Sequence, residues 1–171
     1  GRVWNTFDIV EQYQGITVQS KSGHAFIKDV MREHNAVYGG EMSAHHYFRD
    51  FAYCDSGMIP WLLTIALLSE TEQSLSTLVE NMIAKFPCSG EINFKVADTQ
   101  ATVQKIFDHY ADQNPLVDRT DGVSLDFGAW RLNVRASNTE PLLRLNIESR
   151  LDRHPKPMQD YVDELTRLIQ S

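Results

Sequence analysis

The spacing of apolar residues changes once along this chain, at the segment 85–90 (KFPCSG), and this change limits what the chain can fold into. Before the segment, short β-branched runs alternate with stretches at helical spacing, which is typical of a sheet with helices packed on it. After it, several runs alternate between apolar and polar residues, as strands with one buried face do. A chain of 171 residues has room for two small domains. We therefore predict an α/β domain at 1–86 and an α+β domain at 87–171.

The first half is predicted to contain two short strands, at 16–18 and 36–38, and four helices. Apolar residues at i, i+3 and i+4 place the helices at about 4–14, 24–32, 58–68 and 75–86. Strands that alternate with helices predict a parallel sheet with helices on its faces. Two strands are fewer than such a sheet normally needs. We therefore expect a truncated domain whose missing strand lies upstream of Gly1, in a longer protein of which this chain is a fragment.

The most apolar run is 58–68 (MIPWLLTIALL). A helix that crosses a bilayer needs about 20 residues, and this run is shorter and contains a proline. The N-terminus also lacks the charged-then-apolar pattern of a signal peptide. We therefore expect a buried helix at this run and no interaction with a membrane.

The second half is predicted to follow the order β-α-β-β-β-α. Asp98 can cap the first helix, and the second helix begins at about Pro157. Period-two alternation places the strands at 91–96, 123–127, 130–134 and 143–147. Gly128 and Ala129 form a connection short enough for a hairpin turn. The pattern predicts a four-stranded antiparallel sheet with both helices on one side, so the fold class of the whole chain is α/β plus α+β.

The charge balance argues against a nucleic-acid partner. The chain has 16 basic and 23 acidic residues and a net charge of −7, whereas a protein that binds nucleic acid usually needs a basic surplus to neutralise phosphates. An anion must therefore be held by a local cluster of donors, because the overall field repels it. The two cysteines, Cys54 and Cys88, have no spacing for zinc and form no disulfide framework, so we expect a cytoplasmic protein.

The segment 39–46 (GGEMSAHH) follows a predicted strand, where ligands bind in open α/β sheets. Glu41 and Ser43 lie two residues apart, so in an extended loop both side chains point the same way. A carboxylate beside a hydroxyl can hydrogen-bond to neighbouring sugar hydroxyls. The alternative is a polar turn with a helix cap. Metal binding by His45 and His46 is disfavoured, because adjacent histidines point apart and no carboxylate cluster completes a site.

The segment 135–139 (RASNT) lies between two predicted strands. It offers the donors of Arg135, Ser137, Asn138 and Thr139, and it contains no carboxylate. Side-chain and backbone N–H groups in such a loop can surround a phosphate, with the guanidinium as a bidentate partner. The alternative is a hairpin loop built from turn-forming residues, with the arginine paired to a nearby acid.

His24 follows the predicted strand at 16–18 and begins a helix. Its ordinary pKa lies near neutrality, so it can act as an acid or a base, although a histidine in this position more often caps or packs. The chain contains no Walker loop, no dinucleotide-binding fingerprint and no nucleophile elbow.

Three segments together resemble the α-D-phosphohexomutase family: 39–48 (GGEMSAHHYF), 22–24 (SGH) and 135–141 (RASNTEP). Members of this family are four-domain enzymes that interconvert hexose 1-phosphates and hexose 6-phosphates. The resemblance implies that this chain is the third and fourth domains. The run 48–61 (FRDFAYCDSGMIPW) and the motif 40–43 (GEMS) resemble the bacterial phosphomannomutase branch of the family.

The resemblance also implies roles for particular residues. Glu41 and Ser43 correspond to the ligands of the sugar hydroxyls. His24 and His45 correspond to histidines of the active-site cleft that assist proton transfer or orient the substrate. The phosphate that is not being transferred is held by four residues: Arg135, Ser137, Asn138 and Thr139.

Two motifs of the family are absent from this sequence: the phosphorylated serine in a Ser-His-Asn-Pro context and the Asp-Gly-Asp type magnesium loop. The resemblance therefore implies that Mg²⁺ belongs to the full-length enzyme and is not bound by this chain. It also implies two partners, a hexose phosphate (mannose 1-phosphate or mannose 6-phosphate) and the missing N-terminal domains of the same protein. We expect no turnover by this chain alone.

Two alternatives remain open at the level of the sequence. The first keeps the family and changes the substrate to the phosphates of glucose or glucosamine. The second is a non-catalytic module that binds a phosphosugar through the same loops.

Overall fold

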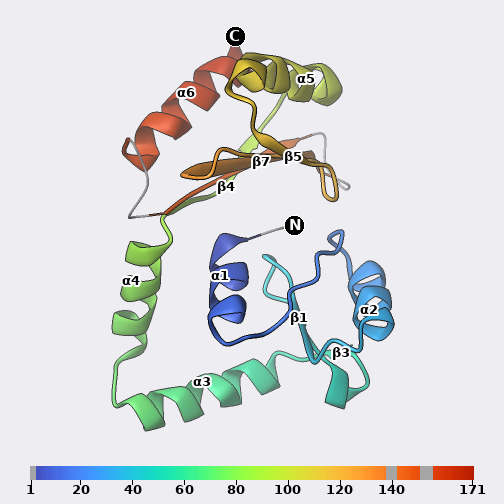
Figure 1. Cartoon of the computed structure of the whole chain (residues 1–171), viewed down its shortest axis with the longest axis vertical. Helices are drawn as coiled ribbons and strands as arrows, with labels where there is room; N and C mark the ends of the chain where they lie inside the picture. Colours follow the sequence, from blue (N-terminus) through green and yellow to red (C-terminus); the bar gives the residue numbers. More distant parts are fainter. Residues whose placement is uncertain (1–2, 138–141, 151–155) are drawn as a thin grey trace. The chain divides into compact units, whose positions relative to one another are not determined.

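The computed structural model describes residues 3–137, 142–150 and 156–171 and divides into two compact units, 1–81 and 82–171 (Figure 1). Each unit has its own cluster of buried hydrophobic residues. The division falls within the helix α4 (Leu75–Lys85), which lies just before the predicted linker.

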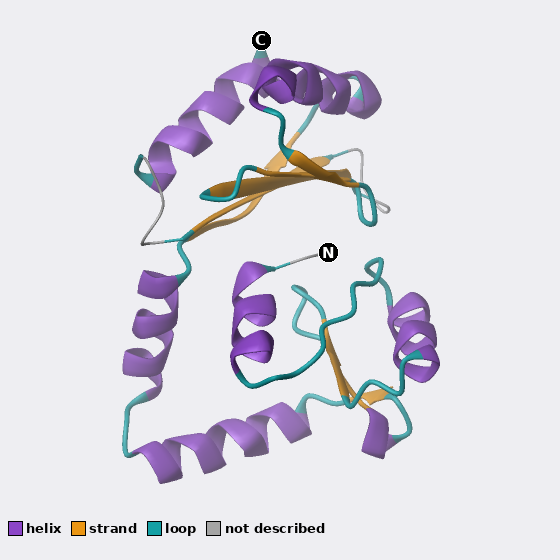
Figure 2. Ribbon diagram, in the orientation of Figure 1, coloured by secondary structure: helices purple, strands orange, loops and turns teal. Residues whose placement is uncertain are grey.

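The first unit contains helices and short strands, in the order α1 (Trp4–Gln12), α2 (His24–Glu33), β1 (Tyr38–Gly40), β2 (His46–Phe48), a 3₁₀ turn (Arg49–Phe51), β3 (Cys54–Asp55), α3 (Met58–Thr71) and the start of α4. The strands pair in the order β1-β2-β3, and both pairings are antiparallel. Figure 2 shows α2 lying beside this small sheet.

The packing of α2 against the small sheet forms the core of the first unit. Ile27 and Met31 on α2 are buried together with Tyr47 on β2. A Cβ at Gly39 would lie 2.7 Å from the Met31 sulfur and 3.1 Å from Ile27 Cγ2, so the close approach of helix and strand requires glycine at this position. This contact fixes the chain immediately before the loop that begins at Glu41.

Two predictions about the strands of the first unit are corrected by the structure. Residues 16–18 have no regular structure, and Ile16 is 92% exposed. The strand predicted at 36–38 lies instead at Tyr38–Gly40 and belongs to an antiparallel hairpin rather than to a parallel pair. A strand is stable only when a neighbour satisfies its backbone groups, and the described part of the first unit gives residues 16–18 no such neighbour.

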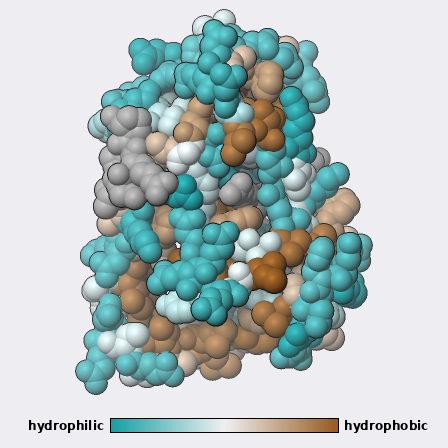
Figure 3. Space-filling view, in the orientation of Figure 1, coloured by the Kyte–Doolittle hydropathy of each residue, from teal (hydrophilic) through white to brown (hydrophobic). Residues whose placement is uncertain are grey.

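The helix α3 was predicted to be buried, and the structure shows that none of its residues is buried. Trp61 is 55% exposed and Leu63 is 58% exposed. In Figure 3 apolar surface extends along the lower edge of the view, where α3 lies in Figure 1. The apolar run therefore predicted a helix correctly, but it did not predict whether the helix is buried. Within the described ranges, no helix combines the length and the apolar character that crossing a membrane requires.

The second unit contains a five-stranded antiparallel sheet in the order β4-β8-β7-β6-β5. Its elements are β4 (Cys88–Phe94), α5 (Thr99–Tyr110), a 3₁₀ turn (Ala111–Gln113), β5 (Leu116–Asp118), β6 (Val123–Asp126), β7 (Trp130–Ala136), β8 (Leu143–Ser149) and α6 (Met158–Gln170). Figure 2 shows α5 and α6 on the same side of the sheet, as predicted. The sequence predicted four strands, because β5 is only three residues long and too short to show alternation.

Strict alternation along β7 and β8 gives the sheet two different faces. Leu132 and Val134 on β7 are buried in one cluster with residues of α5 and α6, such as Ile106 and Leu165. The residues that alternate with them on β7 are Arg131, Asn133 and Arg135, whose polar side chains point to the opposite face. The predicted cap of α5 is also confirmed, because Asp98 Oδ1 accepts hydrogen bonds from the backbone N–H groups at the start of the helix, at 2.9 and 3.0 Å.

Gly122 and Gly128 allow a matched test of this packing. Both have a positive φ, but a Cβ at Gly122 would lie 2.4 Å from the Val134 carbonyl oxygen and 2.5 Å from Arg135 Cβ, whereas a Cβ at Gly128 would meet nothing within 4 Å. We predict that Gly128→Ala lowers the free energy of unfolding by about 1 kcal/mol, the cost of a left-handed alanine. Gly122→Ala adds backbone displacement and lowers it by about 3 kcal/mol.

Native-state hydrogen exchange at the amides of β7 would measure both effects, because it reports the opening free energy of this sheet alone. Equal losses in the two variants would contradict the described contact between Gly122 and β7.

Candidate functional site

The loop 41–45 connects β1 to β2 and is closed by its own backbone. The Glu41 N–H donates to the His45 carbonyl oxygen at 3.0 Å, and the Ala44 N–H donates to the Glu41 carbonyl oxygen at 3.1 Å. Ala44 has a φ of +63°, which lets the chain reverse within five residues. The loop is therefore a tight hairpin turn and not the extended loop at the end of a parallel strand that the sequence predicted.

The Glu41 carboxylate is held in place by three donors from three parts of the first unit. Oε1 accepts from the Gly23 backbone N–H at 3.0 Å and makes a longer contact of 3.5 Å with the Tyr47 hydroxyl. Oε2 accepts from the Ser43 hydroxyl at 2.8 Å. Burial, followed by the negative charge of Glu41, raises the pKa of Tyr47, so its hydroxyl keeps its proton.

Glu41 and Ser43 are thus brought together, as the sequence predicted, although by a turn. Glu41 is half-buried and Ser43 is exposed. Each carboxylate oxygen can accept more than one hydrogen bond, so a carboxylate with a fixed position keeps acceptor capacity for the hydroxyls of a ligand. Because its donors come from the residue before α2, from the hairpin loop and from β2, the carboxylate does not need to be ordered when a ligand arrives.

His24 is the first residue of α2 and directly follows Gly23, whose N–H binds Glu41. Its side chain is exposed. The start of α2 and the hairpin loop therefore lie side by side, and the structure brings His24 into the neighbourhood of Glu41 through the backbone.

His45 is joined to an aspartate that the sequence did not single out. Its Nδ1–H donates to Asp55 Oδ2 at 2.6 Å, and Asp55 Oδ1 accepts from the His46 backbone N–H at 2.9 Å. The hydrogen bond and charge of Asp55 raise the pKa of His45. The hydrogen bonds from His45 and from the His46 backbone in turn lower the pKa of Asp55. With Nδ1 engaged, Nε2 is the atom of His45 that can exchange a proton with a ligand.

The two adjacent histidines have different partners. His45 contacts Asp55, whereas His46 Nδ1 lies 2.7 Å from the Tyr38 hydroxyl. Across the described residues, no three His, Cys, Asp or Glu side chains are grouped so as to hold a metal ion. No chemical step is assigned to a metal in this chain.

The second predicted site lies at the end of β7, in the second unit. Arg135 Nη2 is 3.4 Å from Glu91 Oε2 on β4, and Arg144 Nη1 on β8 is 3.3 Å from Glu91 Oε1. Arg135 and Arg144 are directly opposite one another in the β7–β8 register. Two guanidinium groups therefore share one carboxylate, in a chain whose net charge is −7.

The loop that follows Arg135 is closed at its base by the Ser137 N–H, which donates to the Leu142 carbonyl oxygen at 2.8 Å. Ser137 is half-buried beside the end of β7. The predicted phosphate ligands Asn138 and Thr139 lie outside the described residues.

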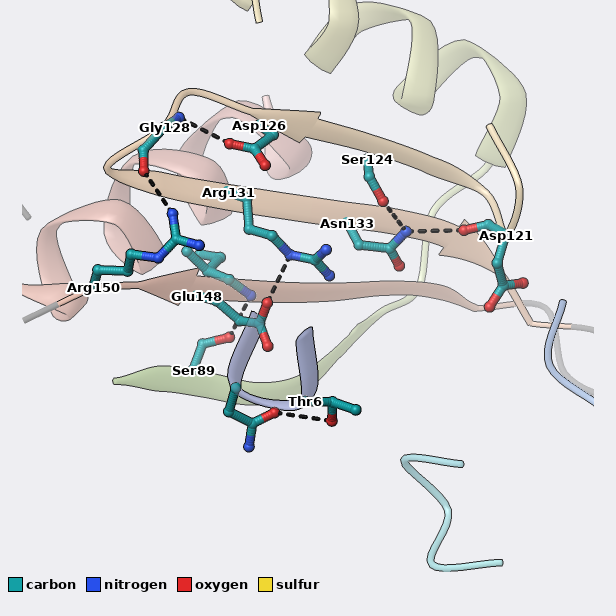
Figure 4. A network of polar contacts seen from close by, with 12 residues as sticks. Thr6, Ser89, Asp121, Ser124, Asp126, Gly128, Arg131, Asn133, Glu148 and Arg150 are labelled. Atoms are coloured by element: carbon teal, nitrogen blue, oxygen red, sulfur yellow. Dashed lines mark hydrogen bonds and ion pairs between the residues drawn. The ribbon is translucent and has the colours of Figure 1, made fainter. Parts of the chain in front are cut away.

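Arg135 belongs to a polar row on the face of the sheet that turns away from α5 and α6. Figure 4 shows part of this row. Arg131 Nε is 2.7 Å from Glu148 Oε2, and Asn133 Nδ2 donates to Ser124 Oγ at 2.9 Å. Arginine and asparagine alternate with the core residues of β7, so the same pattern that buries Leu132 and Val134 places Arg135 on the polar face.

Sequence reasoning missed four groups that hold these side chains: the Gly23 N–H, Asp55, Glu91 and Arg144. Asp55 lies 10 residues from His45, and Glu91 lies 44 residues from Arg135. Strand pairing brings each pair together. The available signal for Arg144 was its place in a strictly alternating strand, which puts it on the same face as the polar residues of β7.

Comparison with known proteins places both units in one family. Residues 3–86 match the model of the phosphoglucomutase/phosphomannomutase α/β/α domain III, and residues 91–165 match the model of the C-terminal domain of the same proteins. A solved structure of a phosphoglucomutase/phosphomannomutase family protein from Burkholderia thailandensis has a similar fold. Its TM-score is 0.70 at 22% identity, over 98% of this chain and 36% of that one.

Curated relatives are more similar in sequence. Proteins named phosphohexose mutases, from Xanthomonas campestris pv. campestris (strain B100), are 65% identical over 87% of this chain and 33% of the relative. A phosphomannomutase from Vibrio cholerae serotype O1 is 55% identical over 97% of this chain and 36% of the relative, and one from Salmonella typhimurium is 57% identical over 87% and 33%. The chain spans about a third of the length of these relatives. It belongs to the phosphoglucomutase/phosphomannomutase family and comprises that family's domain III and C-terminal domain.

Proposed function

We propose that this chain is the substrate-holding part of a phosphomannomutase that interconverts mannose 6-phosphate and mannose 1-phosphate in the cytoplasm. The printed names of relatives at 55–57% identity support the reaction class and the sugar. The serine that carries the transferred phosphate and the ligands of the Mg²⁺ ion belong, in this proposal, to parts of the protein outside this chain.

The observation that carries the proposal is the prepositioned Glu41 carboxylate. Its two oxygens are anchored by the Gly23 N–H and by the Ser43 hydroxyl, and they remain at an exposed hairpin turn. A carboxylate beside a hydroxyl matches a pair of neighbouring sugar hydroxyls, because the carboxylate accepts from both and the hydroxyl oxygen can accept a further bond. In the proposal, Glu41 and Ser43 bind the 3- and 4-hydroxyls of the hexose.

The phosphate that stays in place during the reaction is assigned to Arg135 and to the loop that includes Ser137, Asn138 and Thr139. The guanidinium can donate two parallel hydrogen bonds to phosphate oxygens. The presence of two guanidinium groups, Arg135 and Arg144, at this end of β7 and β8 supports this assignment, since the chain as a whole repels anions.

In the proposed reaction, the phosphoserine passes its phosphoryl group to the free hydroxyl of the bound hexose monophosphate, which gives a bisphosphorylated sugar. The sugar then reverses in the site and returns its other phosphoryl group to the serine. A grip on one phosphate and on the 3- and 4-hydroxyls suits both orientations, because the reversed sugar presents these groups similarly. His24 and His45 assist proton transfer at the hydroxyl or orient the sugar.

The name of the Xanthomonas relatives, phosphohexose mutases, specifies no single sugar and keeps the phosphates of glucose and glucosamine as alternatives. Comparing dissociation constants for mannose 1-phosphate, glucose 1-phosphate and N-acetylglucosamine 1-phosphate decides between them. The tightest binder identifies the substrate class.

Arg135→Ala tests the phosphate assignment. We predict that mannose 1-phosphate binds at least tenfold more weakly, because a hydrogen bond to a charged group contributes about 1.5–3 kcal/mol. Calorimetric or NMR titration of the chain measures the change, with Arg167→Ala as the control. Arg167 lies on α6, on the other side of the sheet, and its Nε donates to the Asp163 carbonyl oxygen. Equal weakening in both variants would count against a specific role for Arg135.

Glu41→Gln tests the assignment of the sugar hydroxyls. Glutamine keeps one acceptor oxygen for the Gly23 N–H but replaces the other with a donor, so we predict about tenfold weaker binding of mannose 1-phosphate. Glu33→Gln, at the end of α2, is the matched control for the lost charge. The same NMR titration measures both. If Glu41→Gln binds as tightly as Glu33→Gln, Glu41 does not contact the sugar.

The His45–Asp55 pair gives a prediction for pH dependence. Because Asp55 raises the pKa of His45, the imidazole stays protonated to a higher pH than an ordinary histidine. Asp55→Asn removes the acceptor and its charge, so His45 should lose its proton at a lower pH than in the parent chain. The imidazole Cε1–H signal followed by NMR against pH measures this. Asp50→Asn, whose carboxylate contacts Arg49, should leave the His45 titration unchanged. A titration that is identical in Asp55→Asn and the parent would show that the pair does not form.

A further inference from the structure

The register of β7 and β8 creates an electrostatic conflict at the phosphate site. Arg135 and Arg144 are directly opposite each other in the β7–β8 register, and both contact the same carboxylate on one face of the sheet. Like charges in directly opposite positions repel and destabilise a sheet. A counter-ion that reaches both groups reduces this repulsion.

Glu91 is such a counter-ion, because its carboxylate contacts both Arg135 and Arg144. It lies on the edge strand β4, beside β8, whereas Arg135 lies on β7, so two strand spacings of about 4.8 Å each separate their backbones. The Glu91 Oε2 to Arg135 Nη2 distance is nevertheless 3.4 Å. The arginine side chain must therefore extend across the polar face of the sheet, toward β4, to make this contact.

Arg144 holds the Glu91 carboxylate in place. Its Nη1 lies 3.3 Å from Glu91 Oε1 and 3.5 Å from Oε2, so Glu91 is held from the neighbouring strand while it contacts Arg135. The three side chains are only 20–33% exposed. Partial burial and the contact with the clamped Glu91 carboxylate restrict the rotamers of Arg135, a side chain that is otherwise costly to order.

We propose that Glu91, clamped by Arg144, is the positioning residue for Arg135 and holds its guanidinium ready for the phosphate of the substrate. This inference rests on the proposed function, because it assigns Arg135 to that phosphate. Glu91 itself does not touch the ligand. Its contribution is to reduce the ordering that binding would otherwise require.

A positioning role and a plain charge effect predict opposite signs. If Glu91 acted only as a negative charge near an anion site, Glu91→Gln would tighten the binding of phosphate, most strongly at low salt. If Glu91 positions Arg135, the same variant weakens binding, and the weakening persists when salt screens long-range charge. Glu91→Asp sharpens the distinction, because it keeps the charge but shortens the side chain by one methylene group.

The experiment titrates the chain with mannose 1-phosphate at about 0.05 M and about 0.5 M salt, across the range in which the screening length falls steeply. Glu91→Gln and Glu91→Asp should each bind about three- to tenfold more weakly than the parent at the higher salt concentration. Asp108→Asn, on α5, is the control for loss of one carboxylate, since its side chain contacts only Gln104 among the described hydrogen bonds.

A second readout separates positioning from damage to the fold. The Nε–H signal of Arg135 in ¹⁵N NMR spectra should broaden or exchange faster in both Glu91 variants, while the amides of the β7–β8 ladder keep their protection. Unchanged or tighter binding by Glu91→Gln overturns the proposal. So does weaker binding with an unaltered Arg135 signal, or loss of protection throughout the sheet.

Arg135→Ala, measured in parallel, keeps the two proposals apart. If Arg135→Ala binds mannose 1-phosphate as the parent does, the phosphate assignment itself fails. If Arg135→Ala loses binding and the Glu91 variants do not, the phosphate assignment stands and only the positioning role of Glu91 is overturned.

Discussion

The ladder between β7 and β8 orders most of the second unit. Seven residue pairs, from Trp130 opposite Ser149 to Ala136 opposite Leu143, hold these central strands in one register. Because side chains alternate, this single register decides both faces of the sheet at once. On one face it aligns the core residues with α5 and α6. On the other it places Arg135 opposite Arg144, so a slip of one residue would bury the arginines and expose the core.

A carboxylate has a comparable part in the first unit. Glu41 connects three segments, the start of α2, the hairpin loop and β2, through the donors of Gly23, Ser43 and Tyr47. The same packing that requires glycine at position 39 brings α2 close enough for the contact with Gly23. In both units a charged side chain is therefore prepared by neighbours before any ligand binds, which lowers the cost of ordering it.

The sequence predicted the elements whose signals are local. Strict alternation gave β6, β7 and β8 to within one or two residues, and Asp98 correctly marked the start of α5. The sequence-based prediction failed where a strand depends on a neighbouring strand. The β-branched run at 16–18 has strand propensity, but the described part of its unit gives it no strand to pair with. Propensity alone does not form a strand, because the backbone groups need partners.

The residues of the candidate sites divide in the same way, into those with a local sequence signal and those that depend on strand pairing. Glu41, Ser43 and Arg135 were predicted as site residues from their types and spacing, which are local signals, and their roles stay predictions. Asp55 and Glu91 were not found, because their roles depend on strand pairs that no local pattern predicts. The family comparison identifies the family of both units, but it does not reveal which side chains hold the loops in place.

We propose that this chain carries prepositioned groups for both the sugar and the phosphate of a hexose phosphate. The most direct test is a titration of the ¹⁵N-labelled chain with mannose 1-phosphate, observing the Gly23 amide and the Arg135 Nε–H together. The account predicts that both signals shift and saturate at the same ligand concentration. If neither shifts with millimolar ligand, or if each also responds equally to mannose without phosphate, the claim is contradicted.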